Sequence, residues 1–322
     1  MAPNKLPPPR PWNSYKAMPE TGIDTPPIER AGYVAIVGRP NVGKSTLINR
    51  LVGQKLAITS PKPQTTRHRL LGIRTGDGVQ AVFVDTPGIH PGQGRALNRY
   101  LNRTATGALE GVDLALMVVQ GTHWTADDQR VLELVKASGR PAVAVVNKID
   151  LVPNKAALFP QLEQLGAQGC FTEIVPVSAR KGSNVERLMQ IVGRLLPAGG
   201  ELFPQDQVTD RTLSFMAAEL VREKLMRHLH QELPYVCTVG IETFDEQPGR
   251  TEISAIIWVE RPSHKGIVIG KGGTMLKQVG SEARADLEKL LETHVFLQLF
   301  VREKSGWTDD DVALRTLGYQ GE

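Results

Sequence analysis

One stretch of the chain has the residue types and the spacing that bind the phosphates of a nucleotide. Residues 38–45 read Gly-Arg-Pro-Asn-Val-Gly-Lys-Ser, two glycines separated by four residues and followed by Lys44 and Ser45. The glycines let backbone amides turn toward phosphate oxygens, Lys44 would reach the β- and γ-phosphates, and Ser45 would hold Mg²⁺. The alternative is a glycine-rich turn that binds nothing, but a strand predicted at 33–37 and a helix predicted at 44–52 favour the phosphate site.

Three further stretches each follow a predicted strand and carry groups suited to a metal ion or a purine. Residues 85–88, Asp-Thr-Pro-Gly, offer a carboxylate that can bind Mg²⁺ through water and a glycine whose amide can approach a γ-phosphate. Alone, this tetrapeptide is also a common turn. In 147–150, Asn-Lys-Ile-Asp, Asp150 can accept two hydrogen bonds from guanine, a donor pair that adenine lacks. Residues 178–180, Ser-Ala-Arg, offer a backbone amide to the guanine carbonyl.

The order of these four stretches, each after its own strand, resembles that of the translation-factor-like GTPases. The resemblance implies a mobile switch segment at 64–68, Gln-Thr-Thr-Arg-His, in which a threonine binds Mg²⁺ when a γ-phosphate is present. We assign this role to Thr66, with Thr65 as the competing candidate and an ordinary polar loop as the alternative. The predicted nucleotide-binding residues are Gly38, Arg39, Pro40, Asn41, Val42, Gly43, Lys44, Ser45, Thr46, Asp85, Thr86, Pro87, Gly88, Ile89, Asn147, Lys148, Asp150, Ser178, Ala179 and Arg180.

The residue directly after the DxxG glycine, which usually orients the attacking water, differs here from that of the best-known small GTPases. They have a Gln directly after the DxxG glycine, whereas this chain has Ile89, and no other residue reads as a general base. Lys44 and Thr66 are expected to support the transition state and the Mg²⁺ ion. In some relatives an Asn at the position of Asn41 helps to bind K⁺, so we expect slow GTP hydrolysis that K⁺ stimulates. The predicted metal ligands are Ser45, Thr66 and, through water, Asp85, with Asn41 for K⁺.

Short apolar strands alternate with helical patterns from residue 31 to residue 196. This rhythm predicts an α/β P-loop GTPase domain with a mostly parallel sheet and helices on both faces. The Pro-rich residues 1–30 are predicted to be a disordered extension, and residues 197–208 a linker. The predicted strands are 33–37, 79–84, 113–119, 142–146 and 174–177, and the predicted helices are 44–52, 95–109, 126–138, 155–166 and 184–195.

A smaller α+β domain is predicted at 209–304, followed by a tail, 305–322, that packs back onto a domain. In this domain, Ile-Gly-Lys-Gly-Gly at 269–273 matches the G-x-x-G signature of KH-type RNA-binding domains. The order of its predicted elements resembles the type II KH arrangement. The alternative is a glycine turn with an ordinary solvated basic face, although 261–281 contain no acidic residue. The predicted elements are a helix at 214–231, strands at 235–243 and 252–259, a helix at 274–292 and a strand at 295–302. The predicted RNA-binding residues are Arg261, Lys265, Ile269, Gly270, Lys271, Gly272, Gly273 and Lys277.

Composition and charge narrow the class of protein. With 322 residues, 41% of them apolar, the chain can form two globular domains. The net charge of +4 permits an acidic partner such as nucleic acid without requiring one. Two distant cysteines exclude a disulfide framework, and no apolar run reaches the length of a membrane span or of a signal-peptide core. We therefore expect a cytoplasmic protein.

The pairing of such a GTPase domain with one KH domain, together with Lys-Ser-Gly-Trp at 304–307, resembles the Era family of GTPases. The resemblance implies Mg²⁺ with GTP or GDP, binding of the 3′ end of 16S ribosomal RNA, a role in assembly of the 30S subunit and, for some members, contact with the inner face of the membrane. We expect a monomer that binds no DNA and in which GTP strengthens RNA binding by moving the KH domain across the linker. The open alternatives are a GTPase acting on transfer RNA, with the second domain as a protein contact, and a structural RNA-binding protein with a vestigial nucleotide site.

Overall fold

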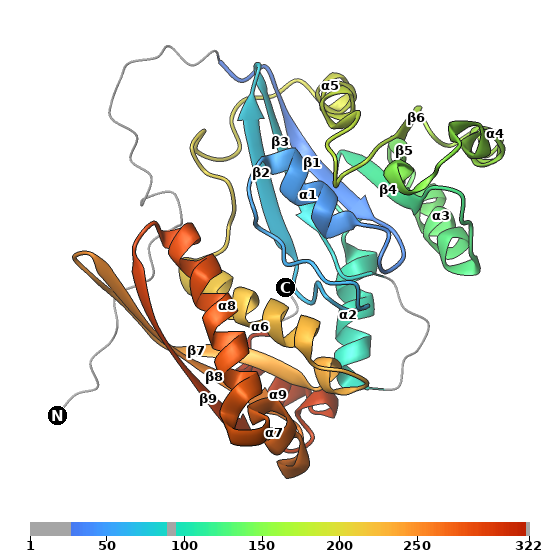
Figure 1. The fold of residues 1–322 in the computed structure, drawn as a ribbon. Coiled ribbons are helices and arrows are strands. Elements are labelled where there is room, and N and C mark those ends of the chain that lie inside the picture. Colours follow the sequence, from blue (N-terminus) through green and yellow to red (C-terminus); the bar gives the residue numbers. More distant parts are fainter. Residues whose placement is uncertain (1–26, 89–94, 320–322) are drawn as a thin grey trace.

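The computed structural model describes residues 27–88 and 95–319, which form two domains, each built on its own sheet (Figure 1). Ile89 and most of the predicted extension 1–30 lie outside the described residues. None of the helices within those two ranges combines the length and the apolar character that crossing a membrane requires. The first domain contains strands β1 (Arg30–Val37), β2 (Leu70–Gly76), β3 (Val79–Asp85), β4 (Leu114–Gln120), β5 (Ala142–Asn147) and β6 (Glu173–Pro176), and helices α1 (Lys44–Val52), α2 (Ala96–Gly107), α3 (Ala126–Ser138), α4 (Phe159–Gly166) and α5 (Val185–Leu195).

The sheet of the first domain has the strand order β2-β3-β1-β4-β5-β6, and its neighbouring strands are parallel except for β2 with β3. Side chains alternate across it: Val34 and Ile36 of β1 pack with α1 and α5, and Ala35 and Val37 pack with α3 and α4. Because helices cover both faces, the strands are apolar along most of their length. The predicted α/β fold with a mostly parallel sheet is confirmed.

Strand β2 was missed by the sequence analysis. It forms a hairpin with β3 through Asp77 and Gly78, whose φ angles of 51° and 72° lie in the left-handed region. An Asp-Gly pair between two strands is a strong signal for such a turn and could have revealed it. The hairpin register places Leu70 opposite Asp85, so the chain just before β2, which contains the switch segment 64–68, returns to the edge where β3 ends.

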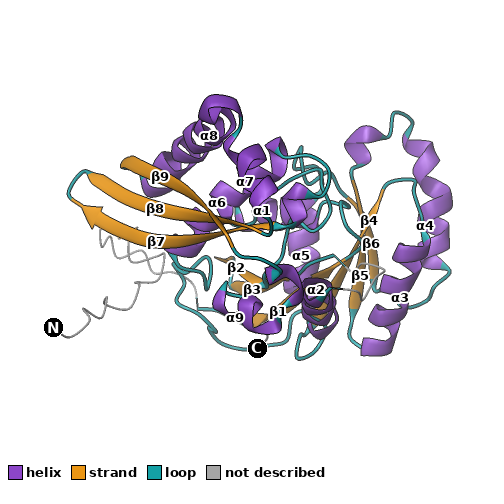
Figure 2. Ribbon diagram, turned by 90° about the horizontal axis from the view of Figure 1, so that it is seen from below, coloured by secondary structure: helices purple, strands orange, loops and turns teal. Residues whose placement is uncertain are grey.

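The second domain has the order α6-β7-β8-α7-α8-β9, with β7 antiparallel and β9 parallel to the central β8. Its helices lie on one face of the sheet (Figure 2), as in the type II KH arrangement. Helix α7 was missed because Gly266 and the β-branched run 267–269 have low helix propensity, although Pro262 suits a first helical turn. The elements are α6 (Leu213–His228), β7 (Cys237–Gln247), β8 (Arg250–Val259), α7 (Pro262–Ile269), α8 (Thr274–Leu291) and β9 (His294–Glu303).

The connection at 197–208 follows the edge of the first domain. The side-chain oxygen Oε1 of Gln80 accepts hydrogen bonds from the backbone amides of Leu202 and Phe203 at 2.8 and 2.9 Å. Further along, the amide of Ile73 donates to the carbonyl oxygen of Val208 at 2.8 Å. The predicted linker is therefore tied to β2 and β3 before α6 begins.

The carboxy-terminal residues 305–319 pack between the two domains. Trp307 is fully buried in a cluster with α2 and α9 (Asp311–Thr316), and its indole N–H donates to the carbonyl oxygen of Val236 at 3.2 Å. The hydroxyl of Tyr319 lies 2.9 Å from that of Thr238 in β7. The tail thus joins α2 of the first domain to the KH domain, and Figure 2 shows α9 close to α2.

Candidate nucleotide site and nucleic-acid interface

The phosphate loop joins β1 to α1 at the carboxyl edge of the sheet. Gly43 has a φ of 100°, and a Cβ added there would lie 2.4 Å from Nδ2 of Asn147. A Cβ added to Gly38 would lie 2.5 Å from the carbonyl oxygen of Val118. Close packing against the ends of β4 and β5 therefore requires both glycines, in addition to the backbone shape of the loop.

Lys44, the first residue of α1, is buried under this loop. Its Nζ donates to the carbonyl oxygens of Gly38 at 2.8 Å and Arg39 at 3.1 Å. Burial lowers the pKa of Lys44 to about 8, while the negative charge of Asp85 opposes this shift. The unpaired amides of the first helical turn lie at the same place, so a phosphate there would meet an ammonium group and a helix N-terminus together.

Other residues of the phosphate loop and of 85–88 contribute backbone and packing. The Arg39 side chain forms an ion pair with Asp128 of α3 at 2.9 Å, which leaves its backbone for a phosphate. Residues 85–88 are buried, and a Cβ added to Gly88 would lie 2.9 Å from the backbone nitrogen of Pro40. The Asp-Thr-Pro-Gly stretch is thus pressed against the phosphate loop, where the amide of Gly88 can approach a γ-phosphate.

Ser45, Thr66 and Asp85 form a cluster of oxygen atoms below the phosphate loop. The hydroxyls of Ser45 and Thr66 lie 2.9 Å apart, and each donates to Oδ2 of Asp85 at 3.3 Å. Burial raises the pKa of Asp85 to about 6, and its Oδ1 is buried without a hydrogen-bond partner among the described residues. The competing Thr65 instead donates to the carbonyl oxygen of Lys62 at 2.7 Å, so the geometry favours Thr66. Hydroxyl and carboxylate oxygens with one acceptor unsatisfied fit a hard divalent cation such as Mg²⁺.

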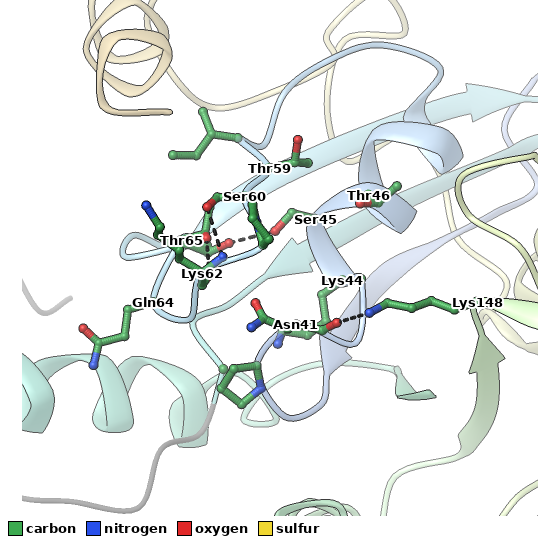
Figure 3. Close-up of a pocket in the computed structure, with 16 residues that line it drawn as sticks. Asn41, Lys44, Ser45, Thr46, Thr59, Ser60, Lys62, Gln64, Thr65 and Lys148 are labelled. Atoms are coloured by element: carbon green, nitrogen blue, oxygen red, sulfur yellow. Dashed lines mark hydrogen bonds between the residues drawn. The ribbon is translucent and has the colours of Figure 1, made fainter. Parts of the chain in front are cut away.

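A cavity of about 260 Å³ opens beside this cluster (Figure 3). The phosphate loop and α1, including Asn41 and Thr46, line one side, and residues 58–62 and 64–66 line the other. Gln64 points away from the cavity, and its Nε2 donates to Oδ1 of Asn98 in α2 at 3.2 Å. Lys62 and its neighbours in 59–62 were not predicted to line a site, because no motif marks them.

Asn147 links the phosphate loop to the loops expected to hold the base. Its Nδ2 donates to the carbonyl oxygen of Val42 at 2.9 Å, and its Oδ1 accepts from the amide of Ala179 at 3.0 Å. The neighbouring Lys148, with a φ of 63°, donates from Nζ to the carbonyl oxygen of Asn41 at 2.6 Å (Figure 3). Three separate loops are therefore held at one edge of the sheet, where ligands of α/β folds bind.

Asp150 and Ser178 meet although 28 residues separate them. The Ser178 hydroxyl donates to Oδ1 of Asp150 at 2.7 Å, which orients the carboxylate that would read guanine. The Arg180 side chain is exposed, and its carbonyl oxygen, like that of Ala179, accepts a hydrogen bond from the Arg50 guanidinium. Arg50 was missed by the sequence analysis, since nothing near it in the chain indicates a contact this distant.

In the KH domain, the G-x-x-G loop connects α7 to α8. Gly270 has a φ of 77°, and a Cβ there would lie 2.7 Å from Cβ of Met275, so the turn requires glycine. Ile269 is half-buried against the domain core and supports the loop from below. The predicted RNA-binding residues that are exposed are Arg261, Lys265, Lys271, Gly272 and Lys277.

A groove of about 380 Å³ runs between α8 and β9 beside this loop. Gly273 and Lys277 line it, together with Gly280, Ser281 and Arg284, which the sequence analysis did not name. The spacing of three or four residues along α8 places these side chains on one helical face, a signal that could have found them. Two leucines of β9 form the apolar wall. An apolar wall with a basic rim suits the bases and the backbone of single-stranded RNA.

Comparison with known proteins identifies the same two domains. A family model described as "50S ribosome-binding GTPase" matches residues 33–148, and a KH domain model matches residues 232–308. The GTPase Era of Pseudomonas fluorescens (strain Pf0-1) is 52% identical over 290 residues, which cover 90% of this chain and 97% of that protein. The GTPase Era of Pseudomonas aeruginosa (strain LESB58) is 53% identical over 296 residues, covering 92% of this chain and 97% of the relative.

Two solved structures have the same fold over most of the chain. A crystal structure of Era in complex with MgGDPNP and nucleotides 1506–1542 of 16S ribosomal RNA is 38% identical, has a TM-score of 0.88, and covers 91% of this chain and 100% of that one. A tyrosine-to-alanine variant of Aquifex aeolicus Era bound to GDP·AlF4⁻ is also 38% identical, with a TM-score of 0.87 and the same coverage. Since about half of its residues are identical to those of Era proteins over 90% of its length, the chain belongs to the Era family of GTPases.

Proposed function

We propose that this chain is a GTP-dependent switch that binds and hydrolyses GTP with Mg²⁺, binds the 3′ region of 16S ribosomal RNA and assists assembly of the 30S subunit. The observation that carries the proposal is the presence, in one chain, of the Ser45–Thr66–Asp85 cluster and of the groove beside the G-x-x-G loop. The Era structure with MgGDPNP and 16S nucleotides 1506–1542, similar over 91% of this chain, supports the same ligands here.

In this proposal the chain's own residues supply orientation and charge for GTP hydrolysis. The loop amides and the N-terminus of α1 hold the phosphates, and Lys44 stabilises the charge that develops as the γ-phosphoryl group is transferred. Ser45 and Thr66 would hold Mg²⁺ through their hydroxyls, and Asp85 would hold it through water. The ion, when bound, neutralises charge on the phosphate oxygens. Because Ile89 has no polar group to orient water, we expect slow intrinsic hydrolysis.

We further propose that K⁺ binds near Asn41 and stimulates the reaction. Asn41 lines the cavity, and its φ of 62° places it in a left-handed turn of the phosphate loop (Figure 3). Lys148 holds its carbonyl oxygen, which keeps this turn in place. A monovalent cation beside the phosphates would add the positive charge that an arginine supplies in other GTPases.

Guanine selectivity is proposed to depend on Asp150. A carboxylate accepts hydrogen bonds from both adjacent N–H donors of guanine, and an adenine in the same place would leave this half-buried acceptor unpaired. The hydrogen bond from Ser178 supports this role because it limits rotation of the carboxylate. Asn147 and Lys148 keep the loop against the phosphate loop, so that base and phosphates are bound together.

The switch itself is proposed to depend on the γ-phosphate. In this proposal GTP orders Thr66 and the loop after Gly88, which lies outside the described residues, through contacts that only the γ-phosphate and Mg²⁺ can offer. If this ordering repositions the KH domain, RNA binds more tightly in the GTP state, and RNA must favour GTP over GDP by the same factor. We expect a 16S 3′-end oligonucleotide to bind at least about fivefold more tightly with a non-hydrolysable GTP analogue than with GDP. Equal affinities in a fluorescence titration would end the switch model.

The RNA target is best identified in cells. We propose that the protein acts as a monomer in the cytoplasm on the 30S subunit under assembly, with peripheral contact with the inner face of the membrane, and that it does not bind DNA. Crosslinking followed by sequencing of the bound RNA should recover the 3′ end of 16S ribosomal RNA. Recovery of transfer RNA instead would contradict the proposal.

A further inference from the structure

The segment 59–67 packs against the KH domain, and its residues 59–62 and 64–66 line the nucleotide cavity. The amide of Thr59 donates to the buried carboxylate of Glu223 at 3.0 Å, and the ammonium group of Lys62 donates to the carbonyl oxygen of Leu229 at the end of α6. In Figure 1 this segment passes between the two domains. One stretch of chain is therefore shared between the nucleotide site and the KH domain.

Thr66 lies between two residues whose groups are held by the KH domain. The carbonyl oxygen of Thr65 accepts a hydrogen bond from the guanidinium of Arg222 at 2.5 Å. The guanidinium of Arg67, which is fully buried, donates to the carbonyl oxygens of Cys237 and Pro234, each at 2.9 Å. The hydroxyl of Thr66 is directed the other way, toward Ser45 and Asp85.

Arg222 is itself held in a fixed position. Its side chain is 2% exposed and forms a two-pronged ion pair with Glu219, one turn earlier on α6, at 2.6 Å for each hydrogen bond. Burial acts to raise the pKa of Glu219, but the charge and hydrogen bonds of Arg222 outweigh it and lower that pKa, so the pair stays charged. A planar guanidinium can bind this carboxylate and the Thr65 carbonyl together, and an ammonium group cannot reproduce that geometry.

We propose that Arg222 is a positioning residue for magnesium-dependent GTP binding: through the carbonyl of Thr65 it holds the hydroxyl of Thr66 beside Ser45 and Asp85. The KH domain thereby completes the metal site of the GTPase domain. The inference rests on the proposed role of Thr66 as a ligand of Mg²⁺ in the GTP state. A residue that acts in this way affects binding of GTP and not of GDP, because Thr66 contacts the ion only when the γ-phosphate is present.

A purely structural contact between the domains would behave differently. Lys55 also crosses the boundary and pairs with Glu223 at 2.6 Å and Asp286 at 3.1 Å, but no hydrogen bond connects it to Thr65 or Thr66. Lys55→Gln is therefore a matched control that weakens the domain contact without releasing the switch threonine.

The test uses the full-length chain and the release of fluorescent nucleotides at increasing Mg²⁺ concentration. We expect Arg222→Gln to raise the Mg²⁺ concentration needed for half-maximal retention of a non-hydrolysable GTP analogue about tenfold, since a charge-assisted hydrogen bond is lost. Release of GDP should be unchanged. Arg222→Lys should fall between Arg222→Gln and the parent chain, and Lys55→Gln should match the parent chain.

A double-mutant cycle with Thr66→Ala separates the outcomes. If Arg222 acts through Thr66, adding Arg222→Gln to Thr66→Ala causes no further change in Mg²⁺ dependence. An additive effect, or an equal effect on the GTP analogue and on GDP, would overturn the proposal. If Arg222→Gln binds no GDP because it does not fold, the same comparison is made with Arg222→Lys. If Thr66→Ala alone left the Mg²⁺ dependence unchanged, the role of Thr66 in the proposed function would be wrong and the positioning role would be lost with it.

Discussion

Replacing Trp307 with Ala should destabilise the molecule more than its place near the carboxyl terminus suggests. Trp307 is 0% exposed and packs with Leu97, Tyr100 and Leu101 of α2. A fully buried tryptophan removes roughly 200 Å² from water, which at about 25 cal/mol per Å² corresponds to about 5 kcal/mol. The substitution also removes the indole N–H, which leaves the carbonyl oxygen of Val236 without its hydrogen-bond donor. Since such truncations cost about 3–5 kcal/mol in other proteins, we expect a loss in that range.

The assay is equilibrium unfolding in urea followed by circular dichroism. Trp307→Phe keeps most of the apolar contact and loses the hydrogen bond, so a loss of about 1–2 kcal/mol is expected. Phe296→Ala is the control, because Phe296 is 48% exposed on β9 and its truncation should cost about 1 kcal/mol or less. A free energy of unfolding for Trp307→Ala within about 1 kcal/mol of the parent chain would refute the view that the tail joins the two domains.

Four further results are expected. Asp150→Asn should shift preference from guanosine to xanthosine nucleotides, because the amide donates where the carboxylate accepted; an unchanged preference in a GTP–XTP competition would contradict the base-reading role. Lys271→Glu should weaken binding of a 16S 3′-end RNA at least about tenfold at low salt without changing GTP affinity, as measured by filter binding. GTP turnover, followed by phosphate release, should be faster in KCl than in NaCl, and equal rates would exclude the K⁺ site. At neutral pH, iodoacetamide should label the half-buried Cys170 of the native protein and leave Cys237 unmodified, as measured by mass spectrometry of the peptides that contain each cysteine. The reason is that burial raises the pKa of the Cys237 thiol to about 12, so that it stays protonated and unreactive.

The nucleotide site could be predicted to a large extent because its parts are contiguous in the chain. The loop 38–45 and the stretches 85–88, 147–150 and 178–180 each follow a strand. Parallel strands end at one edge of a sheet, so an alternating α/β rhythm was enough to expect that these loops meet. The G-x-x-G turn at 270–273 is local in the same sense, since its glycines stand beside the helix they introduce.

Sequence patterns could not decide which of two neighbouring residues, Thr65 or Thr66, is directed toward the candidate metal site. Thr65 and Thr66 have the same side chain, and the hairpin register that sets Leu70 opposite Asp85 brings Thr66 to the carboxylate. Arg39 is still predicted to contact the phosphates through its backbone, but no local pattern indicated that its side chain would pair with Asp128, 89 residues away. Such pairings depend on how elements cross in space, which the spacing of residues along the chain does not contain.

Helix α6 is the element whose environment in the structure was least predictable from the sequence. The sequence predicted a helix at 214–231, and the structure has a helix at Leu213–His228. Yet Arg222, Glu223 and Lys224 are also buried, because α6 packs on the KH sheet on one side and against residues 59–67 on the other. The periodicity of apolar residues indicates which side chains become buried, but not which residues they contact. Arg222, for example, donates its hydrogen bond to the carbonyl oxygen of Thr65, which lies 157 residues away in the chain. From the sequence alone, the phosphate loop at 38–45, the G-x-x-G loop at 270–273 and the fold that carries them could be predicted. The contact between the domains, through α6 and Trp307, was decided by tertiary packing alone, because buried charges and a buried indole are stabilised only by groups that folding brings from distant parts of the chain.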